Sequence, residues 1–143
     1  MTTWLLLTYT LPAEPSALRV KVWRKLKRIG ALLLQDALWV LPARPTTREQ
    51  YQWLAAEIVE MGGQALYWEA QLVMGIAEET LVSQLQEQVN EGYQILLKQI
   101  ESQTDDLESI ARQYQQLLAK DYFRSEFGQR ARQAILEARG AKS

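Results

Sequence analysis

Five cations gather between residues 21 and 28, and they are the side chains of this sequence best suited to binding a ligand. They are Lys21, Arg24, Lys25, Lys27 and Arg28, and Arg44 and Arg48 extend the set. On one face of a helix, such cations neutralise phosphate groups and release counterions, which gives salt-dependent binding of nucleic acid. The alternative is an ordinary solvated face, or one paired with the acidic residues between positions 57 and 108.

A smaller set of arginines suggests a second kind of binding. The guanidinium group is a planar fork that suits bidentate contact with a tetrahedral anion. Arg24, Arg28 and Arg44 are therefore candidates for holding an oxyanion, provided that the fold brings them together.

Composition excludes several kinds of chemistry. The 143 residues include no cysteine and no histidine, which rules out disulfides, thiolate metal sites and a Ser-His-Asp triad. Charge is unevenly spread: residues 1–50 hold eight Lys or Arg against three Asp or Glu, and residues 51–120 hold three against eleven. We expect a protein that is not an enzyme and has no metal site and no cofactor.

The elements that would position these cations follow from periodicity. Residues 3–11 are rich in Leu, Thr, Trp and Tyr and end at Pro12, which predicts a strand. Pro15 and Ser16 then open a helix that runs to Ile29 and is closed by Gly30. Its buried stripe is formed by Leu18, Val22, Leu26 and Ile29, which leaves the cations on the other side.

Residues 31–34 and 38–41 are predicted to be two short strands joined at Gln35-Asp36, because Asp tolerates the left-handed conformation of a hairpin turn. One long strand with a bulge is the alternative. Thr46 and Glu49 fit a capping box, in which Thr46 caps a second helix and Glu49 reaches back to its amide. That helix carries an apolar stripe and stops at Gly62-Gly63, and residues 64–70 form a further strand. The stripe consists of Tyr51, Leu54, Ile58 and Met61.

The order strand, helix, strand, strand, helix, strand predicts a ferredoxin-like α+β unit over residues 1–70. Residues 71–143 are predicted to be a helical extension that packs on this unit as one compact domain. The extension comprises helices over 76–100 and from Leu107 to beyond Leu117, joined as a hairpin by a polar turn at 102–106, and a last helix over 125–138.

Apolar residues point to both faces of the predicted sheet, so we expect both faces to be covered. The C-terminal helices and a second copy of the sheet are the two candidate covers, and we favour a homodimer. The expected interface residues are Trp4, Leu6, Trp39 and Trp68. The five tryptophans are better explained by core or interface packing than as stacking platforms for bases.

The N-terminal residues lack the basic region of a signal peptide, and no segment approaches the roughly 18 apolar residues of a membrane span. We expect a cytoplasmic protein without a membrane partner.

Four segments together resemble the N-terminal domain of the chromate-resistance regulator family ChrB. They are "WLLLTYTLP", "LRVKVWRKLKRIGALLLQDALWVLPAR", "WLAAEIVEMGGQALYWEAQL" and "DYF". The resemblance implies a chromate-responsive transcription regulator that controls a chromate efflux operon, and makes chromate a candidate for the oxyanion. Family members often carry a second, C-terminal domain, and we expect this chain, whose sequence ends at Ser143, to lack it. Asp121, in the last segment, is expected to cap the final helix or to pair with an arginine.

The same strand-and-helix block also resembles the middle domain of phenylacetate-type repressors and the small CRISPR adaptation endonucleases, which both use it to pair subunits. The endonucleases carry an aspartate at the end of the first strand to hold a metal. Thr8-Tyr9-Thr10 occupies that place here and offers no carboxylate.

The leading hypothesis is a non-catalytic regulatory domain that dimerises through its sheet and binds DNA through the first helix. One alternative is an interaction protein whose helical hairpin recruits a partner. The other is an enzyme, either a metal-dependent nuclease or a chromate-converting protein.

Overall fold

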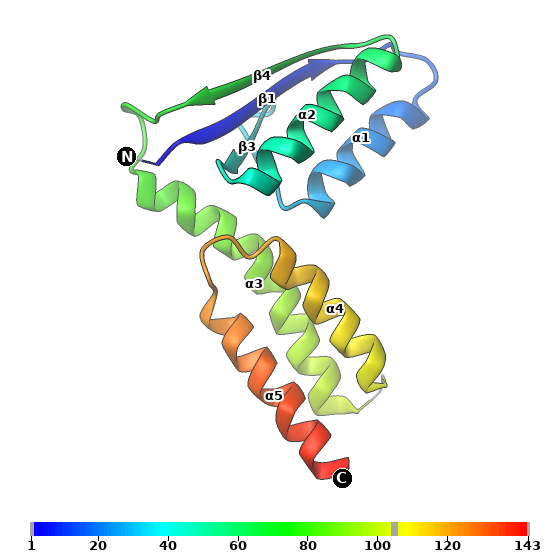
Figure 1. Cartoon of the computed structure of the whole chain (residues 1–143), viewed down its shortest axis with the longest axis vertical. Helices are drawn as coiled ribbons and strands as arrows, with labels where there is room; N and C mark the ends of the chain where they lie inside the picture. Colours follow the sequence, from blue (N-terminus) through cyan, green and yellow to red (C-terminus); the bar gives the residue numbers. More distant parts are fainter. Residues whose placement is uncertain (1, 104–105, 143) are drawn as a thin grey trace. The chain divides into compact units, whose positions relative to one another are not determined.

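The structure is a computed structural model that describes residues 2–103 and 106–142. The chain divides into two compact units, Met1–Glu78 and Glu79–Ser143. The first unit contains a sheet and two helices, and the second is helical (Figure 1). Their elements are β1 (Trp4–Thr10), α1 (Ala17–Arg28), β2 (Leu32–Leu34), β3 (Leu38–Pro42), α2 (Pro45–Glu60), β4 (Gln64–Ala70), α3 (Glu78–Ser102), α4 (Leu107–Ala119) and α5 (Glu126–Lys142).

The four strands form one antiparallel sheet in the order β2-β3-β1-β4. Leu6 in the central strand β1 lies opposite Val40 of β3 and Trp68 of β4. One helix follows β1 and another follows β3, so the predicted order of strands and helices is confirmed. The fold class is α+β, with the ferredoxin-like arrangement expected from the sequence and with helices at the C-terminal end.

The hairpin between β2 and β3 is also confirmed over the alternative of one bulged strand. Leu34 pairs with Leu38, and the turn between them places Gln35 at φ 53° and Asp36 at φ 67°. Both residues lie in the left-handed region that a tight hairpin turn requires.

The expected capping box of Thr46 and Glu49 is wrong, because α2 begins two residues earlier than a cap at Thr46 would place it. Arg44 has extended dihedral angles and is the N-cap, and Pro45 occupies the first helical position. Proline suits that position because its φ is already helical and no backbone partner is needed for its nitrogen. The hydroxyl of Thr47 accepts a hydrogen bond from the Arg44 amide at 2.9 Å and contacts the Pro42 carbonyl oxygen at 2.7 Å.

The two helices of the first unit lie side by side across one face of the sheet (Figure 1). Their inward residues are those of the predicted stripes: Val22 and Leu26 of α1, and Tyr51, Leu54 and Ile58 of α2, are buried. The Tyr51 ring meets the Tyr67 ring edge-on, with 5.8 Å between centroids. This contact fixes the helix-covered face of the sheet as the one that carries Tyr67 of β4.

Strand register then assigns the other sheet residues to that face. Leu7 lies opposite both Trp39 and Tyr67, and Leu5 lies opposite Leu41. Since residues opposite one another share a face, all of them point toward the helices. Leu5, Leu7, Trp39 and Leu41 are buried there and form the core of this unit.

The opposite face of the sheet is apolar as well. Leu6 lies on it beside Trp68, and Thr8 lies beside Leu66. Leu66 is 57% exposed and Trp68 is 54% exposed, so β4 presents an apolar surface on this side. Trp4, on the same face, is buried, and its indole N–H donates to Glu78 Oε1 at 3.1 Å.

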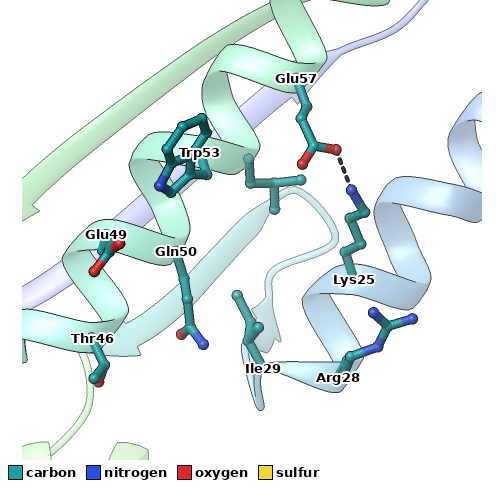
Figure 2. Close-up of a pocket in the computed structure, with 9 residues that line it drawn as sticks. Lys25, Arg28, Ile29, Thr46, Glu49, Gln50, Trp53 and Glu57 are labelled. Carbon is teal, nitrogen blue, oxygen red and sulfur yellow. Dashed lines mark hydrogen bonds and ion pairs between the residues drawn. The ribbon is translucent and has the colours of Figure 1, made fainter.

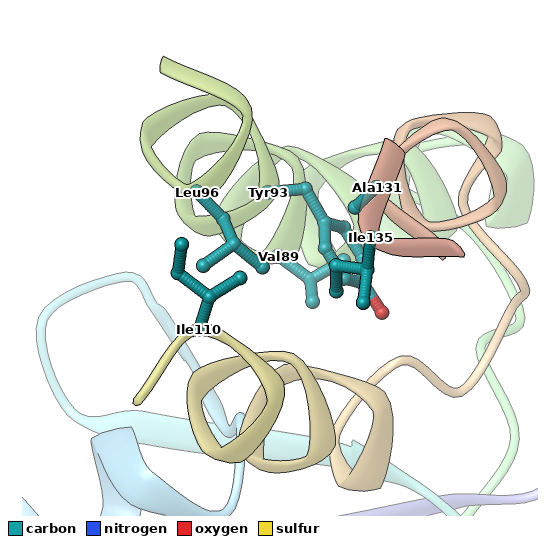
Figure 3. Packing of buried hydrophobic residues seen from close by; sticks show 6 residues of the cluster. All are labelled: Val89, Tyr93, Leu96, Ile110, Ala131 and Ile135. Carbon is teal, nitrogen blue, oxygen red and sulfur yellow. The ribbon is translucent and has the colours of Figure 1, made fainter. Parts of the chain in front are cut away.

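The helical unit has its own hydrophobic core. Figure 3 shows side chains from α3, α4 and α5 gathered into one cluster, comprising Val89, Tyr93, Leu96, Ile110, Ala131 and Ile135. The chain approaches closely at two glycines: a Cβ at Gly92 would lie 2.3 Å from Leu117 Cδ2, and one at Gly128 would lie 2.9 Å from the Tyr93 ring. The predicted helices therefore form a packed unit. The polar turn expected over residues 102–106 includes residues 104–105, which lie outside the described part of the chain.

Candidate functional site: the basic face of helix α1

Helix α1 carries five of the seven cations that the sequence singled out. Lys25, Lys27 and Arg28 lie in its last turn, and no acidic residue lies in its first turn. Positive side chains at the carboxyl end of a helix complement its dipole by roughly 0.3–1 kcal/mol each. Part of this charge therefore has a structural explanation that requires no ligand.

At least two of the seven candidate cations form ion pairs. Lys25 pairs with Glu57 of α2, and Arg48 Nε lies 2.8 Å from Glu69 Oε1 of β4. These pairs agree with the alternative that part of the set is neutralised by the acidic segment. A third cation, Lys27, lies with its Nζ 5.8 Å from the centroid of the Trp23 ring, which is a cation–π arrangement.

Three of the five candidate cations of α1 remain open to a ligand. Lys21, Arg24 and Arg28 are exposed, and no described carboxylate lies within ion-pair distance of them. Their spacing of three and four residues places them along one side of the helix. This side is the strongest candidate site in the first unit for binding phosphate groups.

A cavity of about 370 Å³ lies between α1 and α2 (Figure 2). Arg28 and the Lys25–Glu57 pair line it, and Glu49 and Trp53 line it from α2. Its other lining residues are Ile29, Thr46, Gln50 and Leu54. Two carboxylates balance two cations in this lining, so the cavity has no net preference for an anion.

The structure does not gather the three arginines considered for an oxyanion around this cavity. Arg28 lines it, whereas Arg24 and Arg44 do not. Arg44 is exposed at the N-cap of α2, where its amide donates to Thr47. Arg48 lies on the side of α2 that meets β4, away from α1, because it pairs with Glu69.

The four candidate interface residues differ in the surface they offer. Trp39 is buried beneath the helices and Trp4 is buried on the other face, so neither offers much area to a partner. Leu6 is half-buried and Trp68 is largely exposed, both on the face without α1 and α2. Leu66, which the sequence analysis did not include in the interface, extends this surface.

The sequence analysis also did not predict that two tryptophans on the helices are exposed. Trp53 is 66% exposed and Trp23 is half exposed, although all five indoles were expected to pack in a core or an interface. A signal was present in the sequence: Trp53 falls between Tyr51 and Leu54 but outside the stripe that recurs at helical spacing.

Carboxylates do not gather into a metal site in the part of the chain that the structure describes: no group of three or more Asp and Glu that could hold an ion occurs there. Thr8 and Tyr9 near the end of β1 are half-buried and Thr10 is exposed. Among the described helices, none is long and apolar enough to cross a membrane.

Two comparisons with known proteins bear on this site. A family model described as "Protein ChrB, N-terminal" matches residues 19–101, which take in α1 and its cations and run on into α3. Protein ChrB of Cupriavidus metallidurans (strain ATCC 43123 / DSM 2839 / NBRC 102507 / CH34) is 39% identical over 62 residues. That alignment covers 43% of this chain and 19% of the relative.

Proposed function

Since the chain belongs to the family of ChrB N-terminal domains, we propose that it is a non-catalytic regulatory domain of chromate resistance. In this proposal it pairs with a second copy through its sheet and binds DNA through helix α1. The relative ChrB extends well beyond the aligned region, so the role proposed here concerns the part of a regulator that this chain represents.

The observation that carries the DNA-binding proposal is the open side of α1. Lys21, Arg24 and Arg28 have no carboxylate partner among the described residues, and all three are exposed. A row of such side chains along one helix can follow successive phosphates of a duplex. Contacts of this kind supply most of the sequence-independent affinity of DNA-binding proteins.

The test compares two triple variants that remove the same charge. Lys21→Gln/Arg24→Gln/Arg28→Gln empties the open side of α1, and Lys98→Gln/Arg112→Gln/Arg130→Gln removes three exposed cations of the helical unit. Binding is measured by fluorescence anisotropy to a duplex from the promoter of the chain's own gene, over a range of salt concentrations. The control should bind like the parent chain.

In the α1 variant, the slope of log affinity against log salt should fall by up to about 2.7, or about 0.9 for each phosphate that the helix no longer neutralises. Unchanged affinity and slope in that variant would exclude α1 as the DNA-binding element.

The pairing proposal is supported by the exposed apolar surface on β4 and β1. Leu66 and Trp68 are more than half exposed, and Leu6 lies between Trp68 and Val40 in the register. Apolar surface of this kind on a sheet face is typical of a protein–protein contact. A second copy of the same face would cover it.

A second candidate function, recruitment of a separate protein by the helical hairpin, is favoured by exposed apolar residues there. Ile95 of α3 and Leu118 of α4 are exposed. If the promoter duplex is not shifted in a gel by the parent chain, this candidate replaces DNA binding.

A further inference from the structure

A second basic site lies in the helical unit, outside the residues matched by the family model. A cavity of about 240 Å³ opens between α4 and α5. Tyr114 and Gln115 line it from α4, and Arg132, Leu136 and Arg139 line it from α5, with Ile135 of the buried core also in the lining. Among the described residues that line it, none is a carboxylate.

The two arginines face this cavity because of their spacing. Seven residues of helix turn through almost two full revolutions, so Arg132 and Arg139 lie on the same side of α5. They are separated by a rise of about 10 Å along the axis, at 1.5 Å per residue. Two long side chains can converge over that span on a ligand between them.

Neither arginine has an acidic partner in the described part of the chain. Residues three and four positions away on either side of Arg132 are Gln, Gly, Ile and Leu, and those around Arg139 are Leu, Ile, Lys and Ser. Intrahelical ion pairs are therefore excluded by sequence. Among the described residues, no carboxylate lies within ion-pair distance of either guanidinium group.

The cavity differs in this respect from the one between α1 and α2. There Arg28 shares the lining with Glu49 and Glu57, and the charges balance. Between α4 and α5 the described lining carries two positive charges and no negative one. Of these two cavities, the second is therefore the one that favours an anion.

We infer that the α4–α5 cavity binds a tetrahedral oxyanion between the guanidinium groups of Arg132 and Arg139. Each guanidinium presents a planar fork of N–H donors to such an anion, and the Gln115 amide and the Tyr114 hydroxyl add further donors. The Tyr114 ring packs against Tyr93, with 6.2 Å between centroids, which holds one wall in place. The anion is either a free dianion or a phosphate of a nucleic-acid backbone.

This inference is independent of the proposed function, because it requires neither α1 nor the sheet. The test uses the full chain and two-dimensional amide NMR titrations with sodium phosphate and with sodium sulfate, against sodium chloride at matched ionic strength. Saturable shifts at Gln115 and around Arg132 and Arg139 are expected with both dianions and not with chloride. A titration with duplex DNA shows whether the bound anion is a free dianion or a phosphate of the nucleic-acid backbone.

Three variants distinguish anion binding at this site from a non-specific effect of the positive charge of the protein. Arg132→Gln/Arg139→Gln should weaken binding at least tenfold, and Arg132→Lys should weaken it less, since the charge remains and the fork is lost. Arg130→Gln removes a cation from the same helix outside the cavity, where Arg130 Cζ lies 5.1 Å from the centroid of the Phe127 ring. This variant should bind the dianions as tightly as the parent chain.

If DNA binds more tightly than free phosphate and loses affinity in the double variant, the backbone is the source. If only the free dianions bind, the site takes a small ion. Absence of saturable shifts with every probe, or equal affinity in the parent chain and the double variant, would overturn the inference.

Discussion

Tyr93 and Asp121 form a polar contact within the helical unit. The buried Tyr93 hydroxyl donates to Asp121 Oδ2 at 3.0 Å, and the Ser125 amide donates to Asp121 Oδ1 at 2.9 Å. Asp121 therefore links α3 to Ser125, the residue before α5. The hydroxyl of Ser125 accepts a hydrogen bond from the Phe127 amide of α5 at 3.1 Å, so Ser125 rather than Asp121 caps that helix. Burial and the neighbouring carboxylate raise the pKa of the Tyr93 phenol above its ordinary value of 10.0.

The raised pKa of Tyr93 gives stability a pH dependence of known sign. Above pH 10 the phenol of the unfolded chain loses its proton while the folded phenol keeps it, so the free energy of unfolding falls as pH rises. Tyr93→Phe should cost about 1–2 kcal/mol at neutral pH, because a hydrogen bond to a carboxylate is removed. Above pH 10 the free energy of unfolding of the Tyr93→Phe variant should fall less steeply with pH than that of the parent chain. The two slopes should differ by up to about 1.4 kcal/mol per pH unit.

Urea denaturation of both proteins between pH 7 and pH 11 measures these two effects. Parallel curves above pH 10 would contradict the assigned environment of Tyr93.

At the scale of one element, the start of α2 shows how two adjacent threonines differ. Thr46 is exposed, whereas Thr47 is fully buried with its hydroxyl bonded to the backbone at Arg44 and Pro42. The sequence pattern favoured Thr46 as the cap because Glu49 follows at the right distance. Pro45 occupies the first helical position, so the helix starts earlier, and Thr47 is the residue that accepts a hydrogen bond from the amide of the N-cap Arg44.

Replacing each threonine by valine distinguishes these positions. Thr47→Val keeps the shape of the side chain but removes its hydrogen bonds to the Arg44 amide and to the Pro42 carbonyl at a buried position, so it should lower the free energy of unfolding by about 1–3 kcal/mol. Thr46→Val is the matched control and should change it by less than about 0.5 kcal/mol. The measurement is chemical denaturation, and equal losses in the two variants would restore Thr46 as the cap.

Element prediction succeeded where hydrophobic periodicity is strong. The stripes of both helices in the first unit, the hairpin at Gln35-Asp36 and the strand at residues 64–70 all appear where the sequence places them. Helix ends were predicted less well, because caps depend on a few side-chain and backbone bonds. The pattern cannot tell which of several polar residues makes those bonds.

At the scale of the whole molecule, the sheet separates residues that the sequence treats alike. Trp39 and Trp68 both lie on apolar strands, but the register turns Trp39 toward α1 and α2 and Trp68 away from them. A partner can therefore reach Trp68 together with Leu66 and Leu6. Pairing through this face would bury the exposed indole.

The pairing proposal predicts a weaker assembly when this surface is made polar. Leu66→Ser/Trp68→Ser should raise the dimer dissociation constant at least tenfold, which corresponds to about 1.4 kcal/mol, because large aromatic side chains dominate such contacts. Val73→Ser, in the exposed segment after β4, is the control and should leave it unchanged. Sedimentation velocity at micromolar concentration measures both, and a parent chain that sediments as a monomer there would refute the pairing.

The sequence by itself determined the elements, their order and the absence of thiol and imidazole chemistry, because these follow from local periodicity and composition. It also placed cations on the outward side of the first helix, since the apolar stripe fixes the other side. Only the tertiary structure decided which cations stay open, because Glu57 and Glu69 reach Lys25 and Arg48 from other elements. The grouping of Arg132 and Arg139 around one cavity with Gln115 likewise required two helices to pack, and no pattern within either helix contains that contact.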